Sequence, residues 1–335
     1  MLFVRQVSET LKDLLKKIKP YLRWLIIGLT LFFLLAALRS HWQEVSKIRL
    51  GLDDWGLIGI AIAITTIAHI WSAVVWGGIL KLFHVDIPLL AATRIYVRTN
   101  LAKYLPGNVW HFYGRMTKVV ESGSSWGVAS LSVLLEPLLL AAGAVMIAIL
   151  GLGVNLAEIA AMPALKWLIP LGLMAVLTGI HPKFFNPVIQ KVSKGKTKDH
   201  APVFLKVYPW QPLLGEIGYV LLRGVGFLLI WQAIAPLEIA QIPALLGIYS
   251  GAWLAGFIVP GAPGGIGVFE TVAIILLETI GQTGVAEGNL LIIVAILRLV
   301  STISELLPFA FLGWRSPQMQ PSLEGHEVAE DIAEQ

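Results

Sequence analysis

Long apolar stretches constrain this chain more than any other feature of its sequence. A helix that crosses a bilayer needs about 20 mostly apolar residues. Windows of this kind fall near residues 22–38, 55–80, 126–152, 163–180, 213–235, 240–259, 267–282 and 289–313. Of the 335 residues, 56% are hydrophobic and 14% are charged, and the mean hydropathy is +0.77, which excludes an ordinary soluble protein. We predict an all-α, polytopic transmembrane helix bundle.

The distribution of charge divides the chain into three parts. We expect residues 1–21 to form a basic amphipathic helix on the cytoplasmic membrane surface. Residues 22–314 are predicted to form the transmembrane domain, with about 6–8 spans and two broken segments near 89–115 and 249–270. Residues 315–335 are acidic and are predicted to be a disordered cytoplasmic tail.

Lysine and arginine cluster on one side of the predicted topology. Three segments carry six basic residues each, namely 1–24, 81–121 and 181–211. Three intervening loops carry none, namely 153–162, 236–243 and 283–288. Cytoplasmic loops of membrane proteins retain positive charge. We therefore predict a multi-pass protein of the plasma membrane, the inner membrane in a bacterium, with both termini cytoplasmic.

Two Pro-Gly breaks interrupt helix-patterned segments in the two halves of the chain. The stretch Leu101-Ala-Lys-Tyr-Leu-Pro-Gly107 is echoed by Leu254-Ala-Gly-Phe-Ile-Val-Pro-Gly261. Proline removes a backbone donor and disfavours helix, so at membrane depth the freed groups are buried in protein or line a wet cavity. Paired breaks point to a transport site in an inverted repeat. A chance echo is the alternative.

Each broken segment allows two topologies. Residues 89–115 form either a re-entrant hairpin from the cytoplasmic side or an amphipathic helix pair at that surface, because they carry too many charges for a lipid-facing span. Residues 249–270 either join two full spans or enter the membrane as a hairpin from outside. Both alternatives return the chain to the same side, so the sequence leaves them open.

The broken segments also carry a resemblance to a known family. The motifs are Leu105-Pro-Gly-Asn-Val-Trp-His111 with Gly114-Arg115, and Pro260-Gly-Ala-Pro-Gly-Gly-Ile-Gly-Val-Phe-Glu270. Over roughly residues 20–315 the chain resembles the flippase-like integral membrane domain of the lysylphosphatidylglycerol synthase family. The resemblance implies lipid handling, since in full-length relatives this domain translocates an aminoacylated phospholipid made by a separate synthase domain. The sequence shows no such synthase domain, so it is closer to stand-alone members and lysyl transfer is not implied.

Polar side chains inside the apolar windows and in the broken segments are the candidates for a binding site. Ionisable residues are costly in a membrane and usually face an interior cavity, and arginine can bind a phosphate bidentately without losing its charge. The candidate lipid head-group residues are Arg98, Lys103, Asn108, His111, Arg115, Arg223 and Arg298. The broken-helix motifs contribute Pro106, Gly107, Pro260, Gly261, Pro263, Gly264, Gly265 and Gly267.

Two glutamates are candidate proton or coupling sites. Glu136 lies in the middle of an apolar window, where its carboxyl would either bind a proton or form a salt bridge between helices. Glu270 stands where helix resumes after the second break. The exposed N–H groups of a helix start favour anions, so this end could receive a phosphate or the carboxylate of Glu270 itself.

Two polar stripes follow helical spacing. Arg298, Ser301 and Glu305 lie at i, i+3 and i+7, and Glu216 with Arg223 repeats the i, i+7 spacing on another window. We predict that the two stripes pair across the bundle, with contact to an anionic head group as the alternative. His69 is interpreted as a hydrogen-bonded interior residue and is not a site candidate.

The sequence lacks the common motifs of enzyme active sites. It contains no cysteine and no HExxH, GxSxG, Walker or CxxC motif. We expect no enzymatic activity, catalytic residue, metal, cofactor or nucleic-acid partner. The expected function is translocation or binding of a polar-headed lipid, anionic or glycosylated, between leaflets. The alternative is a non-transporting accessory subunit that presents membrane lipid to a separate lipid-modifying enzyme, either a synthase or a glycosyltransferase.

Overall fold

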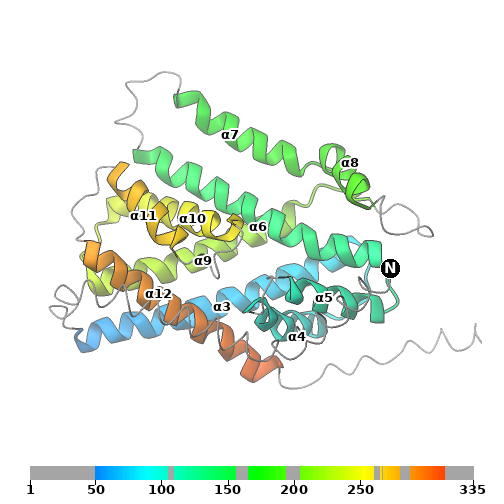
Figure 1. Cartoon of the computed structure of the whole chain (residues 1–335), viewed down its shortest axis with the longest axis horizontal. Helices are drawn as coiled ribbons and strands as arrows, with labels where there is room; N and C mark the ends of the chain where they lie inside the picture. The colour runs from blue at the N-terminus through cyan, green and yellow to red at the C-terminus, as the bar shows by residue number, and fades with distance from the viewer. Residues whose placement is uncertain are drawn as a thin grey trace, which may run out of the picture.

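The structure, a computed structural model of the chain, describes residues 50–104, 109–155, 165–193, 204–259, 265, 267–279 and 287–313. Over these ranges the chain is helical and contains no strand, which confirms the all-α bundle. Figure 1 shows the long helices running side by side along the long axis of the molecule. The predicted basic helix 1–21, the first apolar window and the tail 315–335 lie outside the described residues.

Five of the described segments are long and apolar enough to cross a membrane. They are α3 (Leu52–Leu82), α6 (Trp126–Asn155), α9 (Trp210–Ile234), η3 (Ile239–Gln241) with α10 (Ile242–Ile258), and α12 (Glu287–Pro308) with the π-helical turn η5 (Phe309–Gly313). A helix rises about 1.5 Å per residue, so about 20 residues match a hydrocarbon core of about 30 Å. The chain is a multi-pass integral membrane protein.

The start of α3 shows how the sequence sets a helix boundary. The backbone N–H of Gly51 donates to Oδ2 of Asp54 at 2.8 Å, and Asp53 and Asp54 occupy the first turn. Carboxylates stabilise this end because the free N–H groups of a helix start carry partial positive charge. In α10 the corresponding position holds Pro243, whose missing N–H is not needed in a first turn.

Two pairs of helices form hairpins in opposite halves of the bundle. The first consists of α4 (Leu89–Asn100), η1 (Leu101–Tyr104) and α5 (Trp110–Glu121), and the second of α10 and α11 (Val268–Thr279). Figure 1 shows α4 and α5 toward one end of the long axis and α10 and α11 toward the other. Because α4, α5 and α11 have 12 residues each, or about 18 Å, they are too short to cross the core. Over the residues that the structure describes, the window 267–282 holds a helix of 12 residues, shorter than a typical span.

Small residues let each hairpin close tightly. A Cβ atom on Gly256 of α10 would lie 3.0 Å from Cα of Gly265, and Gly265 has a φ of +71° that only glycine adopts readily. A Cβ on Gly114 of α5 would lie 3.0 Å from Cγ2 of Thr99 on α4. The structure describes two glycines of the second Pro-Gly motif, Gly265 and Gly267, and both have positive φ.

The buried apolar core of the described residues has four clusters, and two of them form the parts that lie around the hairpins. Around the first hairpin, Trp76 and Leu80 of α3 pack with residues of α4, α5 and α6 such as Ile95. Around the second, Ile58 of α3 packs with residues of α9, α10, α11 and α12 such as Phe269. Since α3 contributes one end to each part, its middle lies between them.

Helices α7 (Leu165–Ile180) and α8 (Pro182–Ser193) lie at one edge of the bundle, beside α6 in Figure 1. The side chain of Asn186 holds the segment before α9, because its Nδ2 donates to the Leu205 carbonyl at 3.0 Å and its Oδ1 accepts from the Leu205 N–H at 2.9 Å. The described part of the window 163–180 has 16 residues, somewhat shorter than a typical span.

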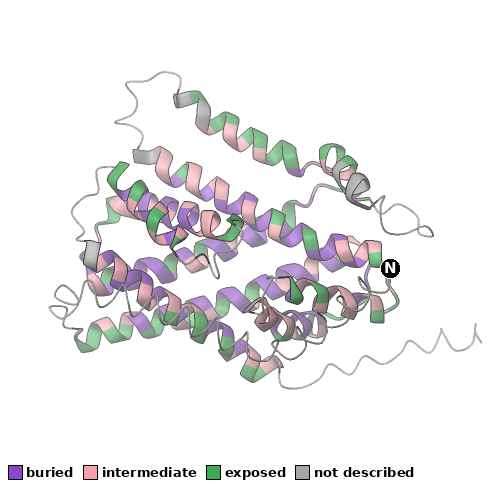
Figure 2. Ribbon diagram, viewed as in Figure 1, coloured by how far each residue is buried: buried purple, intermediate pink, exposed green. Residues whose placement is uncertain are grey.

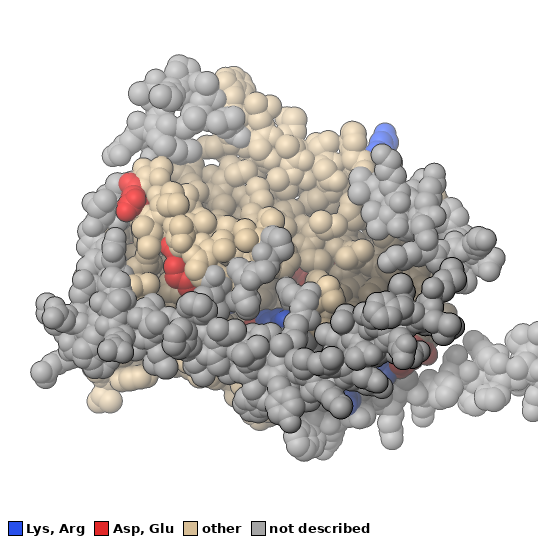
Figure 3. All heavy atoms as spheres, in the orientation of Figure 1, with Lys and Arg blue, Asp and Glu red and all other residues tan. Residues whose placement is uncertain are grey.

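Large apolar side chains cover the outside of the bundle. Leu150, Met174 and Leu214 are each more than half exposed, and Figure 2 shows exposed positions along the outward faces of the long helices. In the side drawn in Figure 3 the described surface is almost entirely uncharged. Soluble monomers rarely expose continuous apolar surface of this kind. It fits a bundle whose sides face lipid.

Candidate functional site

A chain of polar side chains is buried between α3, α4, α5 and α6. Glu136 on α6 is 4% exposed and Arg115 on α5 is 2% exposed, and Nη1 of Arg115 donates to Oε2 of Glu136. The hydroxyl of Tyr96 on α4 donates to Oε1 of Glu136 at 2.6 Å. The Ser72 hydroxyl on α3 lies 2.9 Å from the Tyr96 oxygen and can complete the chain as its donor. Both oxygens of Glu136 are therefore satisfied.

Aromatic rings surround the guanidinium of Arg115. Its Cζ lies 4.3 Å from the ring centroid of Tyr96, with Trp76 at 5.7 Å and Phe112 at 5.5 Å. The negative faces of such rings stabilise a buried cation in addition to its ion pair. Arg115, predicted as a head-group residue, is thus bound to Glu136 and enclosed in this structure. The salt bridge is the alternative that the sequence left open for Glu136.

A second carboxyl group, that of Glu216, acts electrostatically on this cluster but has no hydrogen-bond partner among the described residues. Glu216 on α9 is 0% exposed, and neither of its oxygens has a hydrogen-bond partner among the described residues. Glu136 and Arg115 act on it electrostatically. Buried polar groups are nearly always hydrogen-bonded in folded proteins, so an unpartnered carboxyl at this depth requires a chemical explanation.

A second polar cluster connects α3, η1 and α12. Nζ of Lys103 lies 2.6 Å from Oε1 of Glu305, and Nε2 of His69 lies 3.6 Å from the same oxygen. The His69 ring also packs edge-on against Tyr219 of α9, with 5.9 Å between centroids. His69 is buried, as predicted, but its Nε2 has no hydrogen-bond partner among the described residues, so the predicted hydrogen bond is not found at that atom. Lys103, a head-group candidate, contacts a carboxylate instead.

Arg223 on α9 differs from Arg115 and Arg298, which both pair with a carboxylate. Its Nη2 donates to the Ser301 hydroxyl at 2.9 Å and its Nη1 donates to the Tyr219 hydroxyl at 3.2 Å. None of the salt bridges of the described residues includes Arg223, and its Nε has no hydrogen-bond partner among them. Glu305 and Tyr249 act on it electrostatically. The contact with Ser301 confirms that the two polar stripes, on α9 and α12, pair across the bundle.

The pair Glu270 and Arg298 links α11 to α12. Nη2 and Nε of Arg298 lie 3.0 Å and 3.3 Å from Oε1 of Glu270. The two side chains are about one fifth exposed, at 18% for Glu270 and 21% for Arg298. Since Glu270 occupies the first turn of α11, its charge also suits the N-terminal end of that helix. Each of these two candidates has the other as its partner.

The remaining candidates separate into three groups. Arg98 is exposed on α4. His111 is buried on α5, where desolvation lowers its pKa to about 3, with Arg115 and Lys103 adding to the effect, so its ring is neutral at physiological pH. Several motif residues lie outside the described residues, namely Pro106, Gly107, Asn108, Pro260, Gly261, Pro263 and Gly264.

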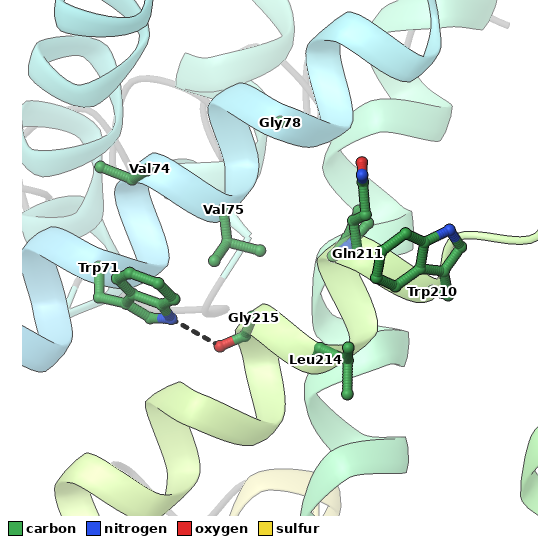
Figure 4. Close-up of a pocket in the computed structure, with 9 residues that line it drawn as sticks. Trp71, Val74, Val75, Gly78, Trp210, Gln211, Leu214 and Gly215 are labelled. Atoms are coloured by element: carbon green, nitrogen blue, oxygen red, sulfur yellow. Dashed lines mark hydrogen bonds between the residues drawn. The ribbon is translucent and has the colours of Figure 1, made fainter.

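A groove of about 370 Å³ opens between α3 and α9, apart from the charged clusters. Figure 4 shows its walls, where Nε1 of Trp71 donates to the Gly215 carbonyl at 2.7 Å. The lining residues are Trp71, Val74, Val75, Gly78, Trp210, Gln211, Pro212, Leu214 and Gly215. Because the walls carry no charge, the groove cannot recognise an anionic group by charge pairing.

Sequence reasoning found most of the charged residues but missed three polar ones. Ser72 and Tyr96 carry no charge and give no signal within an apolar pattern. Glu216 was recognised as part of a stripe but not as a site residue. The described residues contain no group of three or more side chains suited to a metal ion.

No family model matches the chain, and no curated protein does. The resemblance to the lysylphosphatidylglycerol synthase family therefore depends on the two Pro-Gly motifs alone, and the assignment to that family stays a prediction.

Proposed function

We propose that this membrane protein binds an anionic lipid by its head group and carries it between leaflets. The observation that carries the proposal is Arg223, a cation inside the bundle that donates hydrogen bonds to two neutral hydroxyls and forms no direct ion pair with a described carboxylate, although Glu305 acts on it at longer range. Burying a charge is costly unless an opposite charge compensates it. A phosphate group would supply that charge and would accept from the free Nε, and from the hydroxyls of Tyr219 and Ser301.

The position of Arg223 suits a carrier. It lies near the middle of α9, between the two hairpins, so an anion bound there would lie far from both membrane surfaces. We infer that the α4–α5 hairpin and α11 are re-entrant, because α4, α5 and α11 have 12 residues each, too few to span the core, whereas α10 with η3 is long enough to cross it. The two hairpins lie in opposite halves of the bundle. Broken elements that enter from opposite faces and meet near the midplane are typical of transporters built from inverted repeats.

The resemblance of the two Pro-Gly motifs to a flippase-like domain supports the same function. Acyl chains need no protein passage, because they can remain in the bilayer while the head group moves through the bundle. The exposed apolar sides of the helices would contact these chains. Since the sequence has no nucleotide-binding motif, an ion gradient or the gradient of the lipid itself would drive net movement.

The proposal can be tested with purified full-length protein in vesicles that contain fluorescent phosphatidylglycerol or phosphatidylcholine analogues. A membrane-impermeant quencher then reports exchange between leaflets. We expect Arg223→Gln to lower the exchange rate of the anionic analogue roughly 10–100-fold, since a hydrogen bond to a charged group is worth about 1.5–3 kcal/mol. Arg223→Lys keeps the charge but loses the bidentate geometry, so its exchange rate should lie between those of the wild type and Arg223→Gln.

Lys118→Gln is the matched control, because Lys118 is exposed on α5 and pairs only with its neighbour Glu121 among described residues. Its exchange rate should equal that of the wild type. If the protein caused no exchange above empty vesicles for either lipid, the carrier function would be wrong. Binding of the anionic analogue without exchange would instead favour a subunit that presents lipid to another enzyme.

A further inference from the structure

The chemistry of Glu216 is unusual because the side chain is completely buried and unpartnered. It is 0% exposed, and both of its oxygens lack a hydrogen-bond partner among the described residues. An ionised carboxylate in such a place would lose its hydration without gaining a hydrogen bond or an ion pair. This is among the least favourable states that a side chain can have. A carboxyl group there is stable only if it is neutral or if it holds a cation.

The groups that face Glu216 cannot supply that cation. From α5, Arg115 already donates to Glu136 of α6, and Tyr96 of α4 donates to the same carboxylate. The cluster therefore contains two carboxyls, Glu136 and Glu216, and a single fixed positive charge. One arginine balances one carboxylate, and Glu136 is the one that it contacts.

The other helices packed against α9 hold no spare cation for Glu216. From α3, His69 faces Glu305, and from α12, Glu305 receives Lys103. In α10 the only titratable side chain is Tyr249, which acts on Arg223. On α9 itself, Arg223 donates to Tyr219 and Ser301, one turn or more away from Glu216.

We infer that Glu216 is a proton-binding site. One proton adds to one carboxylate oxygen, no covalent bond in the protein breaks, and the cluster of Glu136, Arg115 and Glu216 becomes neutral as a whole. The proton gives Glu216 a hydroxyl and removes the charge that the bundle interior cannot solvate. Since Glu216 has no exposure in this structure, exchange of its proton with water requires a change in the packing around α9.

The position of Glu216 connects the proton to the lipid, and this part of the inference depends on the proposed function. Glu216, Tyr219 and Arg223 follow one face of α9, with Glu216 and Arg223 seven residues or about 10 Å apart. In a medium of low dielectric constant, charges interact strongly over such a distance. A protonated Glu216 favours an anionic head group on Arg223, and an ionised Glu216 repels it. By linkage, each anionic head group that binds should stabilise the bound proton.

Infrared spectroscopy of the full chain in vesicles tests the proton directly. A protonated carboxyl has a C=O stretch that is distinct from the carboxylate bands and shifts in deuterium oxide. We expect this band in the wild type, its loss in Glu216→Gln, and its retention in Glu278→Gln, the matched control with an exposed carboxyl on α11. Glu216→Met is a second variant without a carboxyl, and it should also lack the band and remain monodisperse.

The outcomes separate the proton site from the proposed function. If the band persists in both variants, or appears in the wild type only when sodium is removed, Glu216 does not hold a proton in its resting state and the inference is overturned. If the band is lost in both variants but the protein moves no lipid, the proton site stands and the carrier function is wrong. If both stand, binding of the phosphatidylglycerol analogue should weaken as pH rises in the wild type and lose this dependence in Glu216→Gln.

Discussion

Glu136→Gln should strongly destabilise the protein, by roughly 3–5 kcal/mol. The guanidinium of Arg115 is 2% exposed and Glu136 is the only described carboxylate that accepts a hydrogen bond from it, so the substitution removes its ion-pair partner. Glu216 is the other carboxyl that acts on Arg115, but it makes no hydrogen bond with it. The hydrogen bond from Tyr96 would also lose its charged acceptor. The midpoint of thermal unfolding of the detergent-purified protein measures the effect.

The double variant Glu136→Gln with Arg115→Gln removes both charges and should regain much of that loss, because no isolated charge remains. The matched control is Glu121→Gln, which breaks an exposed pair with Lys118 and should change stability by about 0–1 kcal/mol. An unfolding midpoint for Glu136→Gln equal to that of the control would contradict the ion pair.

Gly151→Ala should destabilise the contact between α6 and α10 by about 1–3 kcal/mol. A Cβ atom at Gly151 would lie 2.3 Å from the carbonyl oxygen of Pro243 and 2.7 Å from the backbone nitrogen of Gly247. Since both neighbours are backbone atoms, no side-chain rotation can relieve the clash and the helices must separate. Gly247→Ala meets the same contact from the other side and should have a similar effect.

Gly59→Ala provides the control for this substitution. Gly59 lies on an exposed face of α3, and a Cβ atom there would meet nothing within 4 Å. Alanine is the better helix former, so this variant should gain roughly 0.5–1 kcal/mol. The same thermal unfolding measurement compares the three variants, and a Gly151→Ala protein as stable as Gly59→Ala would refute the close approach of α6 and α10.

The fold class could be predicted from the sequence because the bilayer restricts spanning segments to long apolar helices. At the window 267–282 hydropathy allowed either a full span or one arm of a hairpin, and the described part of α11 has 12 residues. The Pro-Gly break marked the place where the helix is interrupted, but a break does not reveal how far the helix continues after it. In the described part of α11, Phe269 and Ala273 pack in one buried cluster with residues of α10 and α12.

For the candidate site, spacing placed residues on a shared face but could not identify their partners. The i, i+7 spacing of Glu216 and Arg223 was correct, and the two stripes meet through Ser301. The partners of Glu136 and Glu305 come from other helices, and in the case of Lys103 and Glu305 they are 202 residues apart. Helix packing decides which glutamate pairs with an arginine. The unpartnered carboxyl of Glu216 therefore could not be identified from the sequence alone.

The contact between Lys103 and Glu305 also constrains the order in which the protein can be made. A membrane protein is inserted from its N-terminus as it is synthesised, so α3 and the α4–α5 hairpin precede α12 by most of the chain. Until α12 arrives, Lys103 lacks Glu305, and the Ile62 carbonyl lacks the hydroxyl of Ser304, 242 residues later. The first half of the bundle therefore lacks these two contacts until α12, the last helix that the structure describes, is inserted.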